Sequence, residues 1–284
     1  MAGPASASTS RPVTGSELAT QLRHLGMGQG DVVLVQSSLR SIGRVDGGAK
    51  TVVQALLDVV GPAGTLVVPT YTAGNCDPSR WALTRKRPVP PEQWQSLRDR
   101  MPAFDPARTP AEGVGVIAET VRTWPGAVRS AHPQTSFAAV GPVAAALMAG
   151  HPRACHLGPR SPLGRLAEHH AQVLLLGVRF EVCTAFHLAE YLVPDPPVRS
   201  YECVVRTAGR RHWFRYQDIV LDDRDFGRLG TALEAAPVGR LVRRGTVGGA
   251  DSRRVPLAAA VEYARRWLIA HRTGGRVAGS VTTR

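Results

Sequence analysis

The chain has 284 residues, 43% of them hydrophobic, and a formal net charge of +13. This length and apolar content suffice for one large domain or two small ones with a substantial core. No stretch approaches the roughly 18 apolar residues of a membrane span, and the N-terminus lacks the basic and then apolar pattern of a signal peptide. We therefore expect a globular, cytoplasmic protein without membrane association.

The charge and the cysteines exclude the common signatures of nucleic-acid and zinc binding. All but two of the 35 basic residues are Arg, and they are spread along the chain without a helix-turn-helix, zinc-finger or aromatic RNA-binding pattern. The four cysteines form no C-x-x-C pair or Cys/His cluster, so we expect them to be reduced and structural. A non-catalytic nucleic-acid-binding protein stays an alternative, and it predicts a steep loss of affinity with salt.

The first 70 residues predict a βαβ unit. Its elements are a helix from Thr14 or Ser16 to about Leu25, a strand at 32–36, a helix at 49–60 and a strand at 65–69. A polar loop rich in Ser and Gly follows the first strand, at its carboxyl end. The glycines at 26–30 precede a strand, whereas a dinucleotide-binding loop must follow one, so we interpret them as a turn.

Residues 71–110 form a polar stretch that seven prolines interrupt. Loops of this length are usually functional lids or disordered linkers, and Trp81 and Trp94 argue against disorder. We expect an insertion that lies beside the functional site, with a merely decorative insertion as the alternative.

Helices and strands alternate again in the second half. The expected elements are helices at 111–123 and 142–149, a turn and helix in GPRSPLGRLAEHH, a strand at 173–178 with a helix after it, a hairpin within 201–219 around Ala208-Gly209-Arg210, and an amphipathic helix from 256 to about 271. This order predicts an α/β fold with a mostly parallel central sheet flanked by helices. We expect one domain at 14–272, a disordered arm at 1–13 and a flexible tail at 273–284.

His187 and Glu190 are the strongest catalytic candidates. Three residues apart on a helix, they lie on one face and can serve one pocket as a base and an orienting acid. The same spacing also occurs on solvated helix faces. The position directly after the strand at 173–178 favours function, because open α/β sheets place their ligand crevice there. A metal site would need a third ligand, which the sequence does not identify, so we expect no metal.

Five segments in this order carry a resemblance to a known family. They are VQSSLRSIGRVDGGAKTVVQALLDVVGPAGTLVVPTYT, DPARTPAEGVGVIAET, PGAVRSAHPQTSFAAVG, GPRSPLGRLAE and LLLGVRFEVCTAFHLAEY. From about residue 14 to 270 the chain resembles the aminoglycoside 3-N-acetyltransferases, antibiotic acetyltransferases whose fold differs from the GCN5-related one. The resemblance implies transfer of the acetyl group of acetyl-CoA to the 3-amino group of a 2-deoxystreptamine antibiotic such as kanamycin, gentamicin or neomycin, which confers resistance.

The chemistry implied by the resemblance assigns roles to several of these residues. A protonated amine is no nucleophile, so we expect His187 to accept its proton, with Glu190 either orienting His187 or binding the cationic antibiotic. Direct transfer needs no covalent acyl-enzyme. The implied acetyl-CoA contacts are Ser37, Ser38, Arg129, His132 and Ser136. Backbone amides near the two serines, or the hydroxyl of Thr184, could stabilise the thioester oxygen.

A polycationic substrate on a basic protein requires a locally acidic pocket. The candidate carboxylates are Asp77, Glu92, Asp105 and Glu112 in or beside the insertion, and Asp222, Asp223 and Asp225 in IVLDDRDFGRLG. The second group has three carboxylates within four residues and therefore the stronger claim to the acceptor pocket, with a solvated surface turn as the alternative interpretation. Tyr71 could offer a wall against which a sugar ring packs.

Two positions depart from the family pattern, and three questions stay open. Gln36 replaces the His that many relatives place before the serines, and Cys183 replaces a polar residue such as Asn. Another amine acceptor is the runner-up function. A hydrolase built on Ser38 and His187 is disfavoured, because Ser38 lacks the G-x-S-x-G elbow. The sequence leaves monomer and homodimer equally open.

Overall fold

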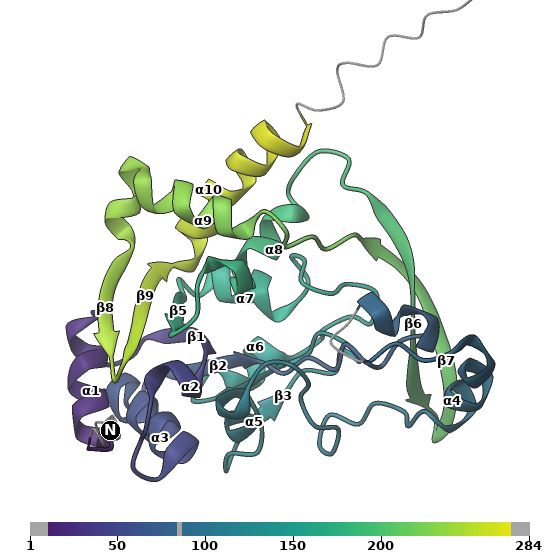
Figure 1. Cartoon of the computed structure of the whole chain (residues 1–284), viewed down its shortest axis with the longest axis horizontal. Helices are drawn as coiled ribbons and strands as arrows, with labels where there is room; N and C mark the ends of the chain where they lie inside the picture. The colour runs from purple at the N-terminus through teal and green to yellow at the C-terminus, as the bar shows by residue number, and fades with distance from the viewer. Residues whose placement is uncertain (1–10, 84–86, 274–284) are drawn as a thin grey trace, which may run out of the picture.

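A computed structural model describes residues 11–83 and 87–273. These residues form a seven-stranded sheet between two layers of helices, and a separate two-stranded hairpin stands beside it (Figure 1). The sheet has the order β3-β4-β2-β1-β5-β9-β8. Its strands are β1 (Val32–Ser37), β2 (Thr65–Pro69), β3 (Val128–Arg129), β4 (Phe137–Val140), β5 (Gln172–Leu176), β8 (Arg243–Val247) and β9 (Ala250–Pro256).

The sheet is mixed, which corrects the expectation of a mostly parallel one. β1 pairs in parallel with β2 and with β5, whereas β4 and β9 join this centre antiparallel. The outermost strands, β3 and β8, are also antiparallel to their neighbours. The reason is connectivity: β3 and β8 each lead to their neighbour through a short loop, and only a longer crossover can join parallel strands.

Helices cover both faces of the sheet. Alternate residues of β1 divide between two cores: Val33 and Val35 pack with α1 (Gly15–His24), α3 (Gly48–Val60) and α5 (Val116–Arg122). Leu34 faces the other core. That second core is built by α6 (Ala144–Met148), α7 (Pro162–Glu168), α8 (Ala185–Glu190), α9 (Phe226–Ala235) and α10 (Leu257–Leu268). Burial on both faces explains why the central strands are continuously apolar in sequence.

Local signals explain where two helices begin. α1 starts with a capping box in which Thr14 and Glu17 satisfy each other's backbone N–H groups, so Thr14 is the cap. The helix expected from residue 111 begins only at Val116. Gly113 and Gly115 have φ values of +72° and +87°, which break the helix and leave the preceding segment as a loop.

Residues 71–83 and 87–110, the described part of the insertion, pack on the hairpin of β6 (Val198–Thr207) and β7 (Arg210–Ile219). Ala208 and Gly209, with φ of +46° and +77°, form a two-residue turn, so Arg210 belongs to β7 rather than to the turn. Arg98 pairs with Glu202 of β6 at 3.2 Å and lies over a β7 tryptophan. The insertion holds the short helices η1 (Pro78–Leu83), η2 (Pro91–Gln93) and α4 (Trp94–Arg100).

Near its ends the described chain departs further from the expectation. Val13, expected in the disordered arm at 1–13, forms a bridge with Val45. Residues 1–10 of that arm and residues 274–284 of the expected tail lie outside the described residues. The hairpin of β8 and β9 and helix α9 have no counterpart among the predicted elements. No helix among the described residues is long and apolar enough to span a membrane. The remaining short helices are α2 (Leu39–Ile42), η3 (Phe180–Val182), η4 (Pro237–Leu241) and the π-helical turn η5 (Ile269–Thr273).

Candidate active site

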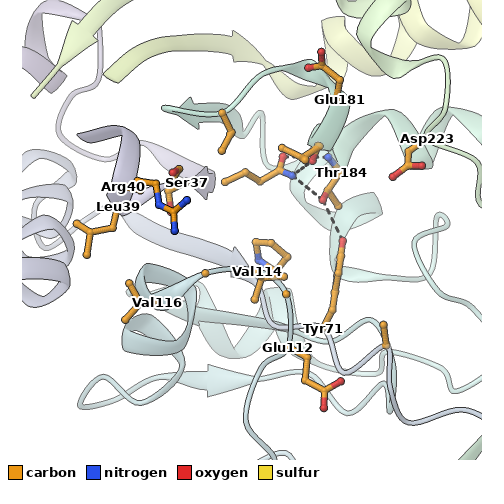
Figure 2. Close-up of a pocket in the computed structure, with 18 of the residues that line it drawn as sticks. Ser37, Leu39, Arg40, Tyr71, Glu112, Val114, Val116, Glu181, Thr184 and Asp223 are labelled. Carbon is orange, nitrogen blue, oxygen red and sulfur yellow. Dashed lines mark hydrogen bonds between the residues drawn. The ribbon is translucent and has the colours of Figure 1, made fainter. Parts of the chain in front are cut away.

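A cavity of about 1070 Å³ opens at the carboxyl ends of β1, β2 and β5. Because these three strands are parallel, the loops that follow them meet at one edge of the sheet. The contributing segments are 36–40, 69–74, 112–116 and 178–184, together with His187 and Asp223 (Figure 2). The first and fourth segments lie within two of the five sequence segments that resemble the acetyltransferase family.

His187 and Glu190 form a hydrogen-bonded pair on α8. The Nδ1 atom of His187 lies 2.6 Å from Oε2 of Glu190. His187 lines the cavity with 15% of its side chain exposed, whereas the Glu190 side chain is only 3% exposed. The ring of Phe226 contacts the imidazole at a centroid distance of 4.8 Å. Because Nδ1–H donates to the carboxylate, Nε2 keeps the lone pair that can accept a proton.

Glu190 lies behind His187 and outside the cavity, where it has further partners. Its Oε1 atom accepts the backbone N–H of Asp222 at 3.0 Å and a guanidinium N–H of Arg272 at 2.5 Å. This position favours the orienting role over direct contact with a substrate. Arg272 is 82 residues away in sequence and was not among the predicted site residues.

Gln36, Tyr71 and Thr184 form a second network on the cavity wall. The Gln36 amide donates to the Thr184 hydroxyl at 2.9 Å, and its carbonyl accepts the Thr184 N–H at 3.1 Å. The phenol of Tyr71 donates to the same hydroxyl at 3.1 Å, and burial raises the pKa of Tyr71, which keeps it protonated. With both lone pairs occupied, the Thr184 hydroxyl has its own proton left to donate.

Ser37 and Ser38 lie in the cavity wall, at the end of β1 and the start of α2. Ser38 also caps α2, since its hydroxyl accepts the Ser41 N–H at 3.2 Å and the Ser41 hydroxyl at 2.9 Å. Ser38 is therefore bonded to its own helix rather than to a base, which gives no support to a hydrolase with Ser38 as nucleophile.

Arg129, His132 and Ser136 were expected near the co-substrate, but none of them lines the cavity. Arg129 donates to the carbonyls of Thr70 at 2.7 Å and of Pro106 at 3.3 Å, and burial lowers its pKa to about 10. Ser136 is buried and donates to the Thr70 carbonyl at 2.7 Å. His132 is fully buried and accepts two backbone N–H groups of its own loop. These contacts hold the insertion and the loop at 130–136 on the sheet.

Of the five aspartates predicted for the substrate, only Asp223 faces the cavity. Asp222 pairs with Arg224, and the hydrogen bonds from Arg224 lower the Asp222 pKa to about 2. Asp225 is bound to Arg272. The other two, Asp77 and Asp105, accept N–H groups of their own turns.

The cavity nevertheless has a marked charge distribution. Three carboxylates line it, those of Glu112, Glu181 and Asp223, while Arg40 is the single Lys or Arg among the described lining residues. Figure 2 shows Arg40 next to Ser37 at one side and the three carboxylates spread around the other sides. Arg40 and Glu181 were missed as site residues, although both lie within the quoted SSLR and RFEVCT segments, a signal that could have identified them.

Within the described residues, no group of three or more His, Cys, Asp or Glu side chains could hold a metal ion. The cysteine nearest the network, Cys183, is fully buried, and burial raises the pKa of its thiol to about 12. The chemistry available at the cavity is therefore that of a histidine–carboxylate pair, hydroxyl donors and local charge.

The chain belongs to the aminoglycoside 3-N-acetyltransferase family, whose model matches residues 34–269. It is 39% identical over 263 residues to an SPbeta prophage-derived aminoglycoside N(3')-acetyltransferase-like protein, YokD of Bacillus subtilis, with 92% of this chain and 94% of YokD covered. It is equally 39% identical, over 274 residues, to aminoglycoside N(3)-acetyltransferase VII of Streptomyces paromomycinus, with 90% and 92% covered.

Solved structures agree with this membership. The crystal structure of YokD aligns with a TM-score of 0.89 at 38% identity and covers 94% of this chain and 97% of its own. AAC-IIIb, solved as a binary complex with CoASH, gives 0.79 at 31% identity, covering 91% and 97%. AAC-VIa, solved bound to sisomicin, gives 0.79 at 34% identity, covering 92% and 98%. The fold is thus that of the family, and the chain is an acetyltransferase of this family.

Proposed function

We propose that this protein transfers the acetyl group of acetyl-CoA to the 3-amino group of a 2-deoxystreptamine aminoglycoside and so confers antibiotic resistance. The observation that carries the proposal is the His187–Glu190 pair at the wall of a large cavity, in a chain of this family. A relative binds CoA and another binds sisomicin, which supports these two substrate classes. The cavity volume of about 1070 Å³ lies at the upper end of the roughly 300–1,000 Å³ typical of small-molecule sites.

His187 acts as the general base. Its Nε2 atom takes the proton of the substrate amine as the amine nitrogen bonds to the thioester carbonyl carbon. The C–S bond then breaks, and His187 returns the proton to the departing thiolate, which yields an amide and free thiol. Glu190 accepts the Nδ1–H bond throughout, so it fixes the tautomer and stabilises the transient imidazolium.

Thr184 supplies the donor for the thioester oxygen. Gln36 and Tyr71 both donate to its hydroxyl, so the hydroxyl proton is directed to a third acceptor. A fixed donor aimed at an oxygen that becomes negative stabilises the transition state more than the ground state. This role also gives Gln36 a function that requires no change of its protonation. Its side-chain amide donates to the Thr184 hydroxyl and accepts the Thr184 backbone N–H.

The charges in the cavity divide it between the two substrates. Ser37, Ser38 and Arg40 provide hydroxyl and guanidinium donors suited to the amide and phosphate groups of the co-substrate. Glu112, Glu181 and Asp223 provide a locally acidic wall for a polycation, despite the net charge of +13 of the whole chain. We do not assign Arg129, His132, Ser136, Asp77, Asp105, Asp222 or Asp225 to substrate contacts.

A different amine acceptor is the second candidate. The relative YokD, at 39% identity, is described only as acetyltransferase-like, and the same acidic wall would accept other polyamines. Product analysis separates the two candidates. The protein is incubated with acetyl-CoA and neomycin, gentamicin or a linear polyamine. Mass spectrometry then counts the added acetyl groups, and NMR locates them. A single acetyl group on the 3-amino nitrogen supports the proposal, whereas acetylation of the polyamine alone would replace it with the second candidate.

A further inference from the structure

Arg272 lies in the π-helical turn η5, which directly continues helix α10. This turn is held by His271, whose ring stacks on Trp267 at 4.1 Å and whose Nδ1 lies 2.8 Å from the Trp267 carbonyl oxygen. The Arg272 side chain, 28% exposed, reaches from the turn to α8 and to the segment before α9. It therefore connects the C-terminal helix to the candidate base.

The Arg272 guanidinium binds two carboxylates and a carbonyl. It donates to Glu190 Oε1 at 2.5 Å, to Asp225 through Nε at 2.8 Å and again through Nη2, and to the backbone carbonyl of Asp222. Burial alone would lower the Arg272 pKa, but the hydrogen bonds to Asp225 and Glu190 outweigh it and raise the pKa. The guanidinium is thus a permanent cation behind the His187–Glu190 pair.

Glu190 depends on this cation. Its side chain is 3% exposed, and a buried carboxylate needs charged or hydrogen-bonding partners. With Arg272 present, the carboxylate charge is shared between Arg272 and His187. Without Arg272, His187 would be the remaining ionic partner of Glu190 among the described side chains, and the imidazolium form would be favoured. An imidazolium cannot accept the proton of an attacking amine.

We propose that Arg272 is a positioning residue that fixes Glu190 and keeps His187 in the neutral, Nδ1-protonated form required of the base. This inference rests on the proposed role of His187. The other charged groups near His187 lie on other elements than Arg272, which itself binds the Asp225 carboxylate among them. They are Glu181 after β5, Asp222, Asp223, Arg224 and Asp225 before α9, and the buried His156, whose pKa burial lowers to about 3.

The test compares Arg272→Gln with a matched control, Arg266→Gln. Arg266 lies on α10, its side chain is 74% exposed, and it pairs with Glu262 at 2.6 Å, so Arg266→Gln removes the same charge away from His187. For Arg272→Gln we expect the acid limb of kcat/KM against pH to move up by about one pH unit. At pH values well below this limb, kcat/KM of Arg272→Gln would be about tenfold lower than that of the wild type. At high pH, kcat/KM of the variant would approach the wild-type value. Arg272→Lys, which keeps the charge, should have a profile closer to that of the wild type.

Three outcomes decide the inference. An equal loss at every pH for Arg272→Gln, or a profile identical to that of the wild type, would overturn it. A shift in Arg266→Gln as large as in Arg272→Gln would also overturn it, because any lost charge would then suffice. NMR titration of the His187 ring supplies a readout without turnover: its protonation midpoint should be higher in Arg272→Gln than in the wild type. If the wild type acetylated no amine, this titration would still decide the role of Arg272, while the proposed function would fail separately.

Discussion

At the scale of residues, Thr184 offers a test of the proposed chemistry that does not touch the base. Thr184→Val keeps the shape of the side chain but removes the hydroxyl that Gln36 and Tyr71 hold. We expect kcat to fall about 10²- to 10³-fold, the usual cost of losing an oxyanion donor, with little change in either KM. Thr184→Ser, which retains a hydroxyl, is the matched control. Equal kcat values for the Val and Ser variants in steady-state assays would refute the assignment.

Local spacing alone can pair residues only when they are close along the chain, whereas Tyr71 and Thr184, 113 residues apart, were named through the resemblance to the family. His187 and Glu190 are three positions apart, so helical geometry alone brought them together. Arg272 is 82 residues from Glu190, and no local pattern links them. Asp222 and Asp225 showed the opposite problem: their density suggested a cation site, yet nearby arginines already occupy both carboxylates.

At the scale of elements, the apolar centre of the sheet was predictable and its charged edge was not. β1, β2 and β5 are apolar because helices bury both of their faces. β8 and β9 contain Arg pairs that the sequence presents as surface charge. In the fold, Arg253 of β9 bonds to Glu234 at 2.7 Å, so charged side chains are satisfied within a strand. Such pairing comes from distant segments and leaves no periodic signal.

The insertion gives a prediction at this scale. Arg129 ties it to the sheet through the carbonyls of Pro106, Thr109 and Thr70. In Arg129→Met these carbonyls, of which that of Thr70 belongs to a buried residue, lose a charged donor, so we expect the free energy of unfolding to fall by about 2–4 kcal/mol. Proteases should then cleave within 71–110 faster than in the wild type.

The control for this prediction is Arg108→Met, on the same insertion. The Arg108 side chain is 90% exposed and lies 4.0 Å from the Asp105 carboxylate, so its loss should change neither quantity. Equal cleavage rates for Arg129→Met and Arg108→Met would show that Arg129 does not hold the insertion.

At the scale of the whole molecule, buried histidines should make the fold sensitive to acid. His132, His151 and His156 lie together beside the β6–β7 hairpin, with ring centroids 4.8 Å apart in two of the pairs. Burial lowers the pKa of His151 from 6.5 to about 4 and that of His156 to about 3. Between pH 6.5 and these values the unfolded chain binds more protons than the folded one, so stability falls as the pH falls.

Each such histidine contributes a slope of about 1.4 kcal/mol per pH unit within that window. We therefore expect the urea midpoint of unfolding to decrease steeply from pH 6.5 to pH 4.5 and to change little between pH 7 and pH 8. The carboxylate of Asp222, with a pKa of about 2, adds its effect only at lower pH. A midpoint that stays constant between pH 6.5 and pH 4.5 would contradict the neutral, buried state of the three rings.

The central claim is that His187 is the base of an acetyl transfer to an aminoglycoside. Thiol release from acetyl-CoA, measured with a panel of 2-deoxystreptamine aminoglycosides for the wild type and His187→Ala, tests it most directly. We expect release in the wild type only when an aminoglycoside is present, and a loss of about 10²- to 10⁴-fold in His187→Ala. Undiminished release in His187→Ala would contradict the role of the base, and no release with any aminoglycoside in the wild type would contradict the proposed substrate.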